Sequence, residues 1–202
     1  MAQENNKIIL EPNIKNISEY VKVYDNLIEL EKLSKFLKFL NVPWLDSMWV
    51  KGKVGDTGDG GVLDESLRIV DCLPLNNLMP SHSMVHWGWF MRKVVIDCTR
   101  QYFKDTKAPL NDFVVSQLDV LRYKPGGKYD PHIDASLMYP RRLSFIYFLN
   151  NDYEGGELHF PGIGEVKIQA NRAILWPSNF MYSHGVKPVK KGLRYSLVAW
   201  IN

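Results

Sequence analysis

The chain has 202 residues, of which 46% are hydrophobic and 23% are charged, and this balance indicates one globular domain and excludes a largely disordered chain. Its formal net charge of +3 is spread along the sequence and is too weak to indicate nucleic acid or a membrane surface as a partner. The N-terminus lacks a signal-peptide pattern and no apolar run is long enough to span a membrane, so we expect a cytoplasmic protein. Two cysteines, Cys72 and Cys98, predict buried thiols rather than a disulfide framework.

The first half of the chain predicts helices joined by loops. Asp25 can cap a helix whose leucines recur at helical spacing as far as Leu40, and Pro43 ends it. A second helix is predicted after Ser81. Between the two helices, residues 52–61 are rich in glycine and predict an exposed loop.

From about Asn111 the pattern changes to short strands separated by glycine, proline and asparagine turns. The predicted strands are residues 113–123, 143–150, 157–160, 166–168, 173–176 and 193–202. Short strands at this spacing indicate a sandwich or barrel, and the helices before them make the fold class α+β. We therefore expect a single structural domain in which a helical and loop region, residues 1–110, packs on a strand-rich core, residues 111–202.

A pair of residues two positions apart, His132 and Asp134, predicts a metal site. Residues i and i+2 of a strand point to one face, so both side chains can reach the same ion. His184 lies in a short extended segment farther along and is the best candidate for a third ligand. Two histidines and one carboxylate with open positions are typical of non-haem Fe(II) oxygenases.

The other three histidines have simpler explanations. His82 and His86 lie four residues apart on the second predicted helix, which is also a metal-binding spacing, but no carboxylate accompanies them. His159 lies in an apolar strand, where we expect a hydrogen-bonded structural residue. A lone His-x-Asp pair is a weak signal, so the neighbouring residues decide its interpretation.

Arg194 indicates a site for an anionic co-substrate. Fe(II) bound by one carboxylate keeps about one positive charge. A dianionic 2-oxo acid could fill the open coordination positions through its keto-acid end. The distal carboxylate then needs a buried cation, and a guanidinium in an apolar strand suits it. If residues 184–194 form a hairpin centred near Val189, His184 and Arg194 face each other.

Five further residues are candidates with weaker signals. Tyr123 and Tyr129 could add hydroxyl donors for the co-substrate, although packing at a barrel rim explains each of them equally well. Ser144, Tyr147 and Trp176 are candidate wall residues, and Ser144 is also a candidate for cofactor binding.

These motifs resemble the 2-oxoglutarate/Fe(II)-dependent dioxygenases of the prolyl 4-hydroxylase-like family. The resemblance covers about residues 115–202 in the family's order and spacing. The matching pieces are residues 121–123, Gly127, Tyr129 and residues 132–134, 142–144, 147–150, 155–161, 184–189 and 192–195, with Trp200 near the end. The resemblance implies a double-stranded β-helix (jelly-roll) core with supporting N-terminal helices.

The resemblance also implies roles for site residues. His132, Asp134 and His184 would bind Fe(II). Arg194 would pair with the distal carboxylate of 2-oxoglutarate, and the Tyr123 hydroxyl would help to bind it. The loop at residues 52–61 lies where relatives carry a mobile loop over the substrate. Some relatives have another tyrosine where this chain has Phe148, so that contact is expected to be absent.

The activity so implied is hydroxylation of an unactivated C–H bond with O2, while 2-oxoglutarate is decarboxylated to succinate; L-ascorbate is often the reductant in this family. The first expected substrate is a prolyl or other residue of a peptide or protein, and the alternative is a free amino acid or another small molecule. A nucleic-acid demethylase is disfavoured because no basic groove is evident. The alternative from a different class is a catalytically silent metal-binding jelly-roll protein, although such a protein would not need both the ligand set and Arg194.

Overall fold

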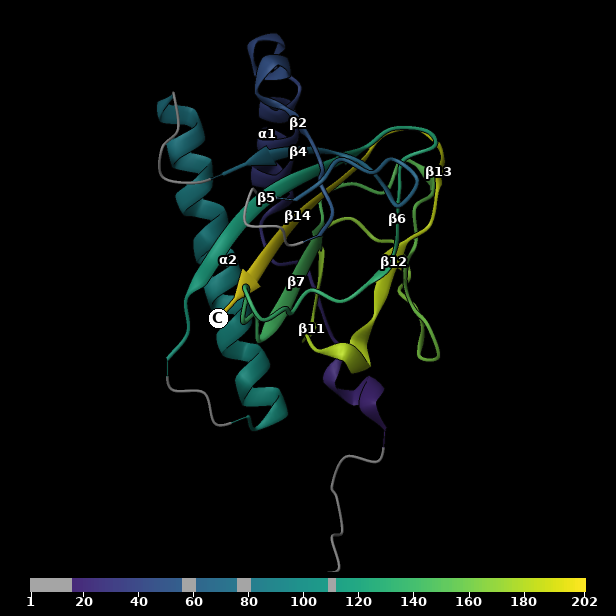
Figure 1. The fold of residues 1–202 in the computed structure, drawn as a ribbon. Helices are drawn as coiled ribbons and strands as arrows, with labels where there is room; N and C mark the ends of the chain where they lie inside the picture. Colours follow the sequence, from purple (N-terminus) through teal and green to yellow (C-terminus); the bar gives the residue numbers. More distant parts are fainter. Residues whose placement is uncertain (1–15, 56–60, 76–80, 109–111) are drawn as a thin grey trace, which may run out of the picture.

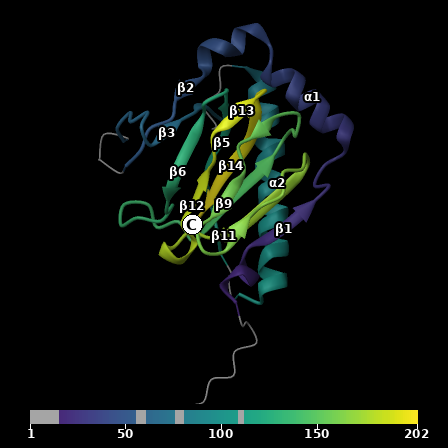
Figure 2. The same cartoon turned by 90° about the vertical axis from the view of Figure 1, so that its right-hand side faces the viewer.

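Two facing antiparallel sheets, with α-helices on the outer side of the larger one, form this protein (Figures 1 and 2). The computed structural model describes residues 16–55, 61–75, 81–108 and 112–202. The helices are α1 (Leu30–Leu40) and α2 (His82–Thr106), with three short 3-10 helices, η1 (Ile17–Tyr20), η2 (Pro43–Met48) and η3 (Phe180–Tyr182). The predicted α+β class with a jelly-roll core is confirmed.

The strands form two main sheets and one small ribbon. The larger sheet has the order β1 (Lys22–Asp25), β11 (Arg172–Pro177), β7 (Leu143–Phe148), β14 (Arg194–Ile201), β5 (Val115–Tyr123), β4 (Asp71–Pro74) and β2 (Val50–Lys51). The smaller sheet has the order β10 (Gly164–Glu165), β9 (Leu158–Phe160), β12 (His184–Val186), β6 (Lys128–His132) and β3 (Arg68–Ile69). The ribbon pairs β13 (Val189–Lys191) with β8 (Glu154–Gly155).

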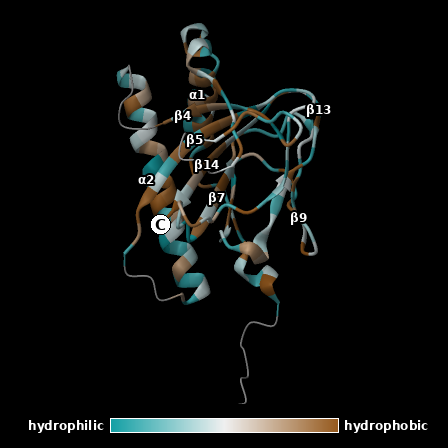
Figure 3. Cartoon of the chain, in the orientation of Figure 1, coloured by the Kyte–Doolittle hydropathy of each residue, from teal (hydrophilic) through white to brown (hydrophobic). Residues whose placement is uncertain are grey.

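Side chains of the larger sheet alternate between a face toward the helices and a face toward the smaller sheet. In β14, the odd-numbered residues from Tyr195 to Ile201 belong to the hydrophobic cluster that also contains residues of α1 and α2. The even-numbered residues Val198 and Trp200 pack in the second cluster, between the sheets. Figure 3 shows hydrophobic residues concentrated in the strands of the larger sheet. The space between the sheets is therefore the inner face from which a site can be built.

Short strands of the first half of the chain, which the sequence predicted as helices and loops, extend both sheets. β1 pairs along β11, so Asp25 forms an ion pair with Arg172 and is not a helix cap, contrary to the prediction. The first helix accordingly begins later, at Leu30. The second helix begins as predicted, with the Ser81 hydroxyl accepting a hydrogen bond from the Met84 amide at 3.2 Å. These strands have only two to four residues each, so their patterns in the sequence are short.

The described parts of the segments at residues 166–168 and 52–61 differ from regular strands. The strand predicted at residues 166–168 does not form; β10 ends at Glu165, after which the Val166 amide donates to the Leu158 carbonyl at 2.9 Å. In the loop at residues 52–61, Val54 and Val62 form an isolated antiparallel bridge, and residues 56–60 lie outside the described part, as do residue 111 and the N-terminal residues 1–15. Within the described residues, no helix has the length and apolar character that crossing a membrane requires.

Candidate active site

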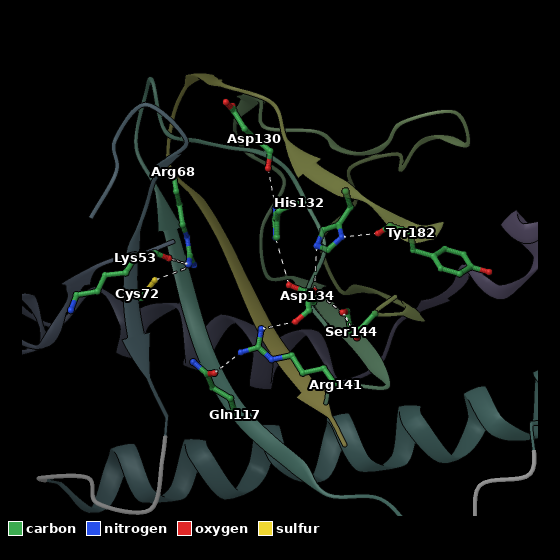
Figure 4. Close-up of polar contacts among 12 residues, drawn as sticks. Lys53, Arg68, Cys72, Gln117, Asp130, His132, Asp134, Arg141, Ser144 and Tyr182 are labelled. Carbon is green, nitrogen blue, oxygen red and sulfur yellow. Dashed lines mark hydrogen bonds and ion pairs between the residues drawn. The ribbon is translucent and has the colours of Figure 1, made fainter. Parts of the chain in front are cut away.

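Two histidines and one aspartate converge at one end of the smaller sheet (Figure 4). His132 is the last residue of β6 and His184 the first of β12, and the two residues are direct cross-strand partners. Asp134 follows β6 and turns back toward both, with 3.6 Å from its Oδ1 to His132 Nε2 and 3.4 Å from its Oδ2 to His184 Nε2. One ligand atom from each residue lies within 4.8 Å of the others, so the three predicted ligands can share one ion.

Hydrogen bonds orient all three side chains. His132 Nδ1 lies 2.9 Å from the Asp130 carbonyl oxygen, and His184 Nδ1 lies 3.1 Å from the Tyr182 carbonyl oxygen. Each carbonyl accepts a hydrogen bond from the protonated Nδ1, which leaves the Nε2 lone pair free for a metal. The Ser144 hydroxyl donates to Asp134 Oδ2 at 2.5 Å.

The protonation states also suit a metal. Burial lowers the pKa of His184 to about 4, so its imidazole is neutral at physiological pH. Burial alone would raise the pKa of Asp134, but the adjacent His184 and His132 and the Ser144 hydrogen bond bring this pKa below its usual range. A neutral imidazole and an ionised carboxylate are the forms that bind divalent ions.

Arg194 is fully buried and only partly satisfied. Its Nη1 donates to the Ser196 hydroxyl at 3.0 Å, whereas Nε and Nη2 have no hydrogen-bond partner. The guanidinium carbon lies 4.8 Å from the centre of the Tyr123 ring and 5.2 Å from that of Phe148. A buried guanidinium with free donors between aromatic rings fits the carboxylate of an acidic co-substrate, because unpaired buried donors are costly.

The predicted hairpin between His184 and Arg194 is wrong. β12 belongs to the smaller sheet and β14 to the larger one, while β13, which lies between them in the sequence, pairs with β8. His184 opposes His132, and Arg194 instead opposes Tyr123 on β5. Gly192 has φ +80°, a left-handed conformation that redirects the chain just before β14. The two residues predicted to bind the same carboxylate are therefore cross-strand neighbours.

The weaker candidates separate into two groups. Tyr129 stacks on His132 with 3.6 Å between ring centres, and the Trp176 ring lies 4.7 Å from that of His184. Tyr147 faces the helices, where its hydroxyl donates to Asn171, so its prediction as a wall residue is wrong. The alternation along β7 instead turns Ser144 and Phe148 inward.

The remaining histidines take no part in the site. His86 packs against Trp87 and Phe90, with ring centres 5.2 and 6.4 Å away. His159 differs from the prediction, because its buried Nδ1 has no hydrogen-bond partner. Among the described residues, His132, Asp134 and His184 form the one group of three or more histidine, cysteine or acidic residues that could hold a metal.

A cavity of about 620 Å³ opens between the sheets in front of the three ligands. Three charged residues of its lining, Arg68, Asp119 and Arg141, were missed in the sequence. Arg141 Nη1 donates to the Asp134 carbonyl at 3.2 Å, and its guanidinium lies 4.0 Å from the Trp200 ring. Asp119 could have been noticed in the sequence, because a carboxylate is rare inside a predicted apolar strand.

The family model described as the 2OG-Fe(II) oxygenase superfamily, where 2OG is 2-oxoglutarate, matches residues 118–202. This C-terminal part of the chain is similar to that superfamily. Over 94 residues it is 39% identical to a PKHD-type hydroxylase of Maricaulis maris (strain MCS10), covering 43% of this chain and 42% of the relative. The chain spans about two fifths of the length of this and similar curated relatives.

Solved structures of oxygenases of this superfamily share the fold. A Pseudomonas putida prolyl-4-hydroxylase aligns with a TM-score of 0.66 at 18% identity, covering 89% of this chain and 91% of that one. A Trichoplax adhaerens prolyl hydroxylase, in complex with a hypoxia-inducible-factor peptide fragment, aligns with a TM-score of 0.69 at 18% identity, covering 91% and 84%. These alignments show that the chain shares the fold of those prolyl hydroxylases. The superfamily implies Fe(II), 2-oxoglutarate and O2, and the side chains described above fit the first two.

Proposed function

We propose that this chain is an Fe(II)- and 2-oxoglutarate-dependent dioxygenase that hydroxylates an unactivated C–H bond of an amino-acid moiety. One observation carries the proposal: two imidazoles and a carboxylate converge within reach of one ion. The same pair of sheets also buries Arg194, whose Nε and Nη2 have no hydrogen-bond partner. Bound Fe(II) and 2-oxoglutarate would supply the oxidising chemistry, in which one oxygen atom of O2 enters the C–H bond and the other enters succinate as CO2 leaves.

The chain's own residues hold and orient these groups. His132, Asp134 and His184 would be the Fe(II) ligands, with Ser144 orienting Asp134 and the stacked Tyr129 ring supporting His132. Contacts of Tyr129 and Ser144 with 2-oxoglutarate itself stay predictions.

Arg194 and the neighbouring Tyr123 would bind the distal carboxylate of 2-oxoglutarate. Arg194 has two free donor nitrogens, and the Tyr123 side chain is as deeply buried beside it. Because water is excluded there, a carboxylate would exchange its hydration for fixed charge-assisted hydrogen bonds.

Two classes of substrate are compatible with this site. A prolyl or other residue of a peptide or protein is the first candidate, and the peptide fragment held by the Trichoplax adhaerens neighbour supports it. A free amino acid is the second candidate, and the opposite charges of Arg68 and Asp119 in the cavity wall support it. Ascorbate as a reductant stays a prediction from the family resemblance.

The test is succinate formation from 2-oxoglutarate by the purified full chain with Fe(II) and O2. Succinate should form, its formation should stop when the metal is chelated, and mass spectrometry should show one added oxygen atom on an accepted substrate. A protein that binds Fe(II) but forms no succinate with any acceptor would instead be the catalytically silent metal-binding protein.

A further inference from the structure

Two opposite charges in the cavity face each other from different sheets. Arg68 lies on β3 of the smaller sheet and Asp119 on β5 of the larger sheet, and both line the cavity that contains the metal-binding side chains. The Asp119 residue is only 7% exposed. No role in the proposed chemistry of Fe(II) and 2-oxoglutarate uses either residue.

Both side chains form hydrogen bonds with neutral groups. Arg68 Nη1 donates to the Lys53 carbonyl at 2.7 Å and Nη2 to the Cys72 sulfur at 3.6 Å, while its buried Nε has no partner (Figure 4). Asp119 Oδ2 accepts one hydrogen bond, from Gln117 Nε2 at 2.6 Å. Among the described residues, no ion pair within 4.0 Å is found for Arg68 or for Asp119. Arg68 and Arg141 are near enough to Asp119 to act on its pKa, but neither Arg68 nor Asp119 has an oppositely charged group in direct contact, so each could still accept one from a ligand.

The backbone is shaped around the arginine. A Cβ atom at Gly52 would lie 2.8 Å from Arg68 Nε and 2.5 Å from the Val70 Cγ1 atom, both closer than real contacts allow. Because Gly52 has no side chain, the Arg68 guanidinium can lie against the cavity wall, where it donates to the Lys53 carbonyl and the Cys72 sulfur.

The arginine is also close to the metal-binding residues. Its guanidinium carbon lies 4.5 Å from the centre of the Tyr129 ring, and the other partner of this ring is His132, 3.6 Å away. One aromatic ring therefore separates the arginine from a candidate ligand. A small molecule bound by Arg68 would place its remaining atoms near the ion.

We propose that the cavity binds a small zwitterion, an α-amino acid, whose carboxylate pairs with Arg68 and whose ammonium group pairs with Asp119. This inference rests on the proposed function and names its substrate class. A residue inside a peptide has neutral amides at both positions and would bring no counter-ion to the half-buried Arg68 or the buried Asp119. A free amino acid supplies both counter-charges at once. In support, burial raises the pKa of the Asp119 carboxyl, and an ammonium group beside it would reverse that effect.

The test is calorimetric titration of the anaerobic full-length protein loaded with Fe(II) and 2-oxoglutarate. The probes are the standard L-amino acids, their N-acetyl derivatives and their amides. At least one free amino acid should bind, and blocking either end should weaken binding about tenfold or more, because one charge-assisted hydrogen-bonded pair is lost. The amino acid that binds should also increase succinate formation and gain one oxygen atom.

Two variants show which residue binds the carboxylate and which binds the ammonium group of the amino acid. Arg68→Gln should make the free amino acid and its amide bind equally, whereas Asp119→Asn should make the free amino acid and its N-acetyl form bind equally. Arg68→Lys should keep part of the preference for a free carboxylate. Matched substitutions on the exposed face of α2, Arg100→Gln and Asp97→Asn, should keep the wild-type preferences at both ends.

Several results would overturn the inference. It fails if no free amino acid binds, if blocked and free forms bind equally to the wild type, or if Arg68→Gln and Asp119→Asn keep the wild-type preferences. Hydroxylation of a peptide with blocked termini, without binding of any free amino acid, would assign the peptide class instead. Succinate formation without any acceptor distinguishes failure of this inference from failure of the proposed function. If succinate forms and no amino acid binds, only the inference about the substrate is wrong. If succinate forms under no condition, the proposed function is contradicted.

Discussion

The two faces of the larger sheet are built from the same strands but differ in chemistry. Toward α1 and α2, residues such as Leu197 and Ile201 are fully buried in a continuous hydrophobic cluster. Toward the smaller sheet, the same strand β14 carries Arg194, and the neighbouring β5 carries Asp119, both buried and both without an ion-pair partner among the described residues. The outer face stabilises the fold, while the inner face holds charges that reduce stability until a ligand binds.

This difference predicts opposite responses to substitution. Changes on the outer face should lower the free energy of unfolding without changing the affinity of the folded protein for metal or ligand. Changes on the inner face should alter metal and ligand binding more than they alter folding. Four substitutions test the contrast, beginning with the largest expected effect.

Asp134→Ala should reduce Fe(II)-dependent succinate formation by at least about 1000-fold, because the ion loses the one carboxylate that neutralises part of its charge. Metal affinity, measured by equilibrium dialysis with Fe(II) under anaerobic conditions, should fall in parallel. Asp130→Ala is the matched control, since that carboxylate pairs with Lys128 and only its backbone carbonyl contacts His132. Retained turnover in Asp134→Ala would remove the residue from the ligand set.

Arg194→Ala should raise the 2-oxoglutarate concentration needed for half-maximal turnover by about 100-fold or more, since a buried carboxylate loses its cation. Arg194→Lys should restore part of the affinity. Arg100→Ala, on the exposed side of α2, should change nothing. An unchanged 2-oxoglutarate requirement in Arg194→Ala would assign the guanidinium a different partner.

Leu197→Ala should lower the free energy of unfolding by about 2–5 kcal/mol, because a fully buried side chain leaves a cavity against the helices. Urea unfolding followed by circular dichroism measures the effect. Leu30→Ala removes the same atoms from a residue that is 71% exposed and should change stability by less than about 0.5 kcal/mol. If both variants lost the same stability, the helix-facing cluster would not be the main source of stability.

Asp119→Asn should raise the free energy of unfolding of the metal-free protein at pH 7 by about 1 kcal/mol. The reason is that burial raises the pKa of this carboxyl in the folded state, so the folded protein takes up its proton more readily than the unfolded chain. The destabilisation is present above the raised pKa and disappears as the pH falls toward 3.8, the ordinary value. The difference in free energy of unfolding between variant and wild type should therefore disappear on acidification. A difference that does not change with pH would show that ionisation of Asp119 is not its cause.

The sequence predicted most of what depends on short motifs. His132 and Asp134 lie two positions apart in the sequence, and Arg194 is a cation in an apolar strand, so the three could be named without a fold. The second helix was also predictable, because Ser81 supplies a local cap. These signals lie within a few residues of the feature that they specify.

Long-range pairing could not be predicted in the same way. Nothing near Val189 shows that the segments on either side of it belong to different sheets, and Arg68 lies on a two-residue strand without a pattern of its own. The cavity wall depends on which strands meet across the gap between the sheets. Its charged residues consequently became visible only with the fold.

The strands that the first half of the chain adds to the larger sheet have a practical consequence for dividing the chain. β1 covers the free edge of β11, and β4 covers that of β5. A fragment limited to residues 118–202, the part that the family model matches, would expose both backbone edges and would lose the helices that cover the sheet. Such exposed edges recruit other chains, so we expect this fragment to aggregate when expressed alone.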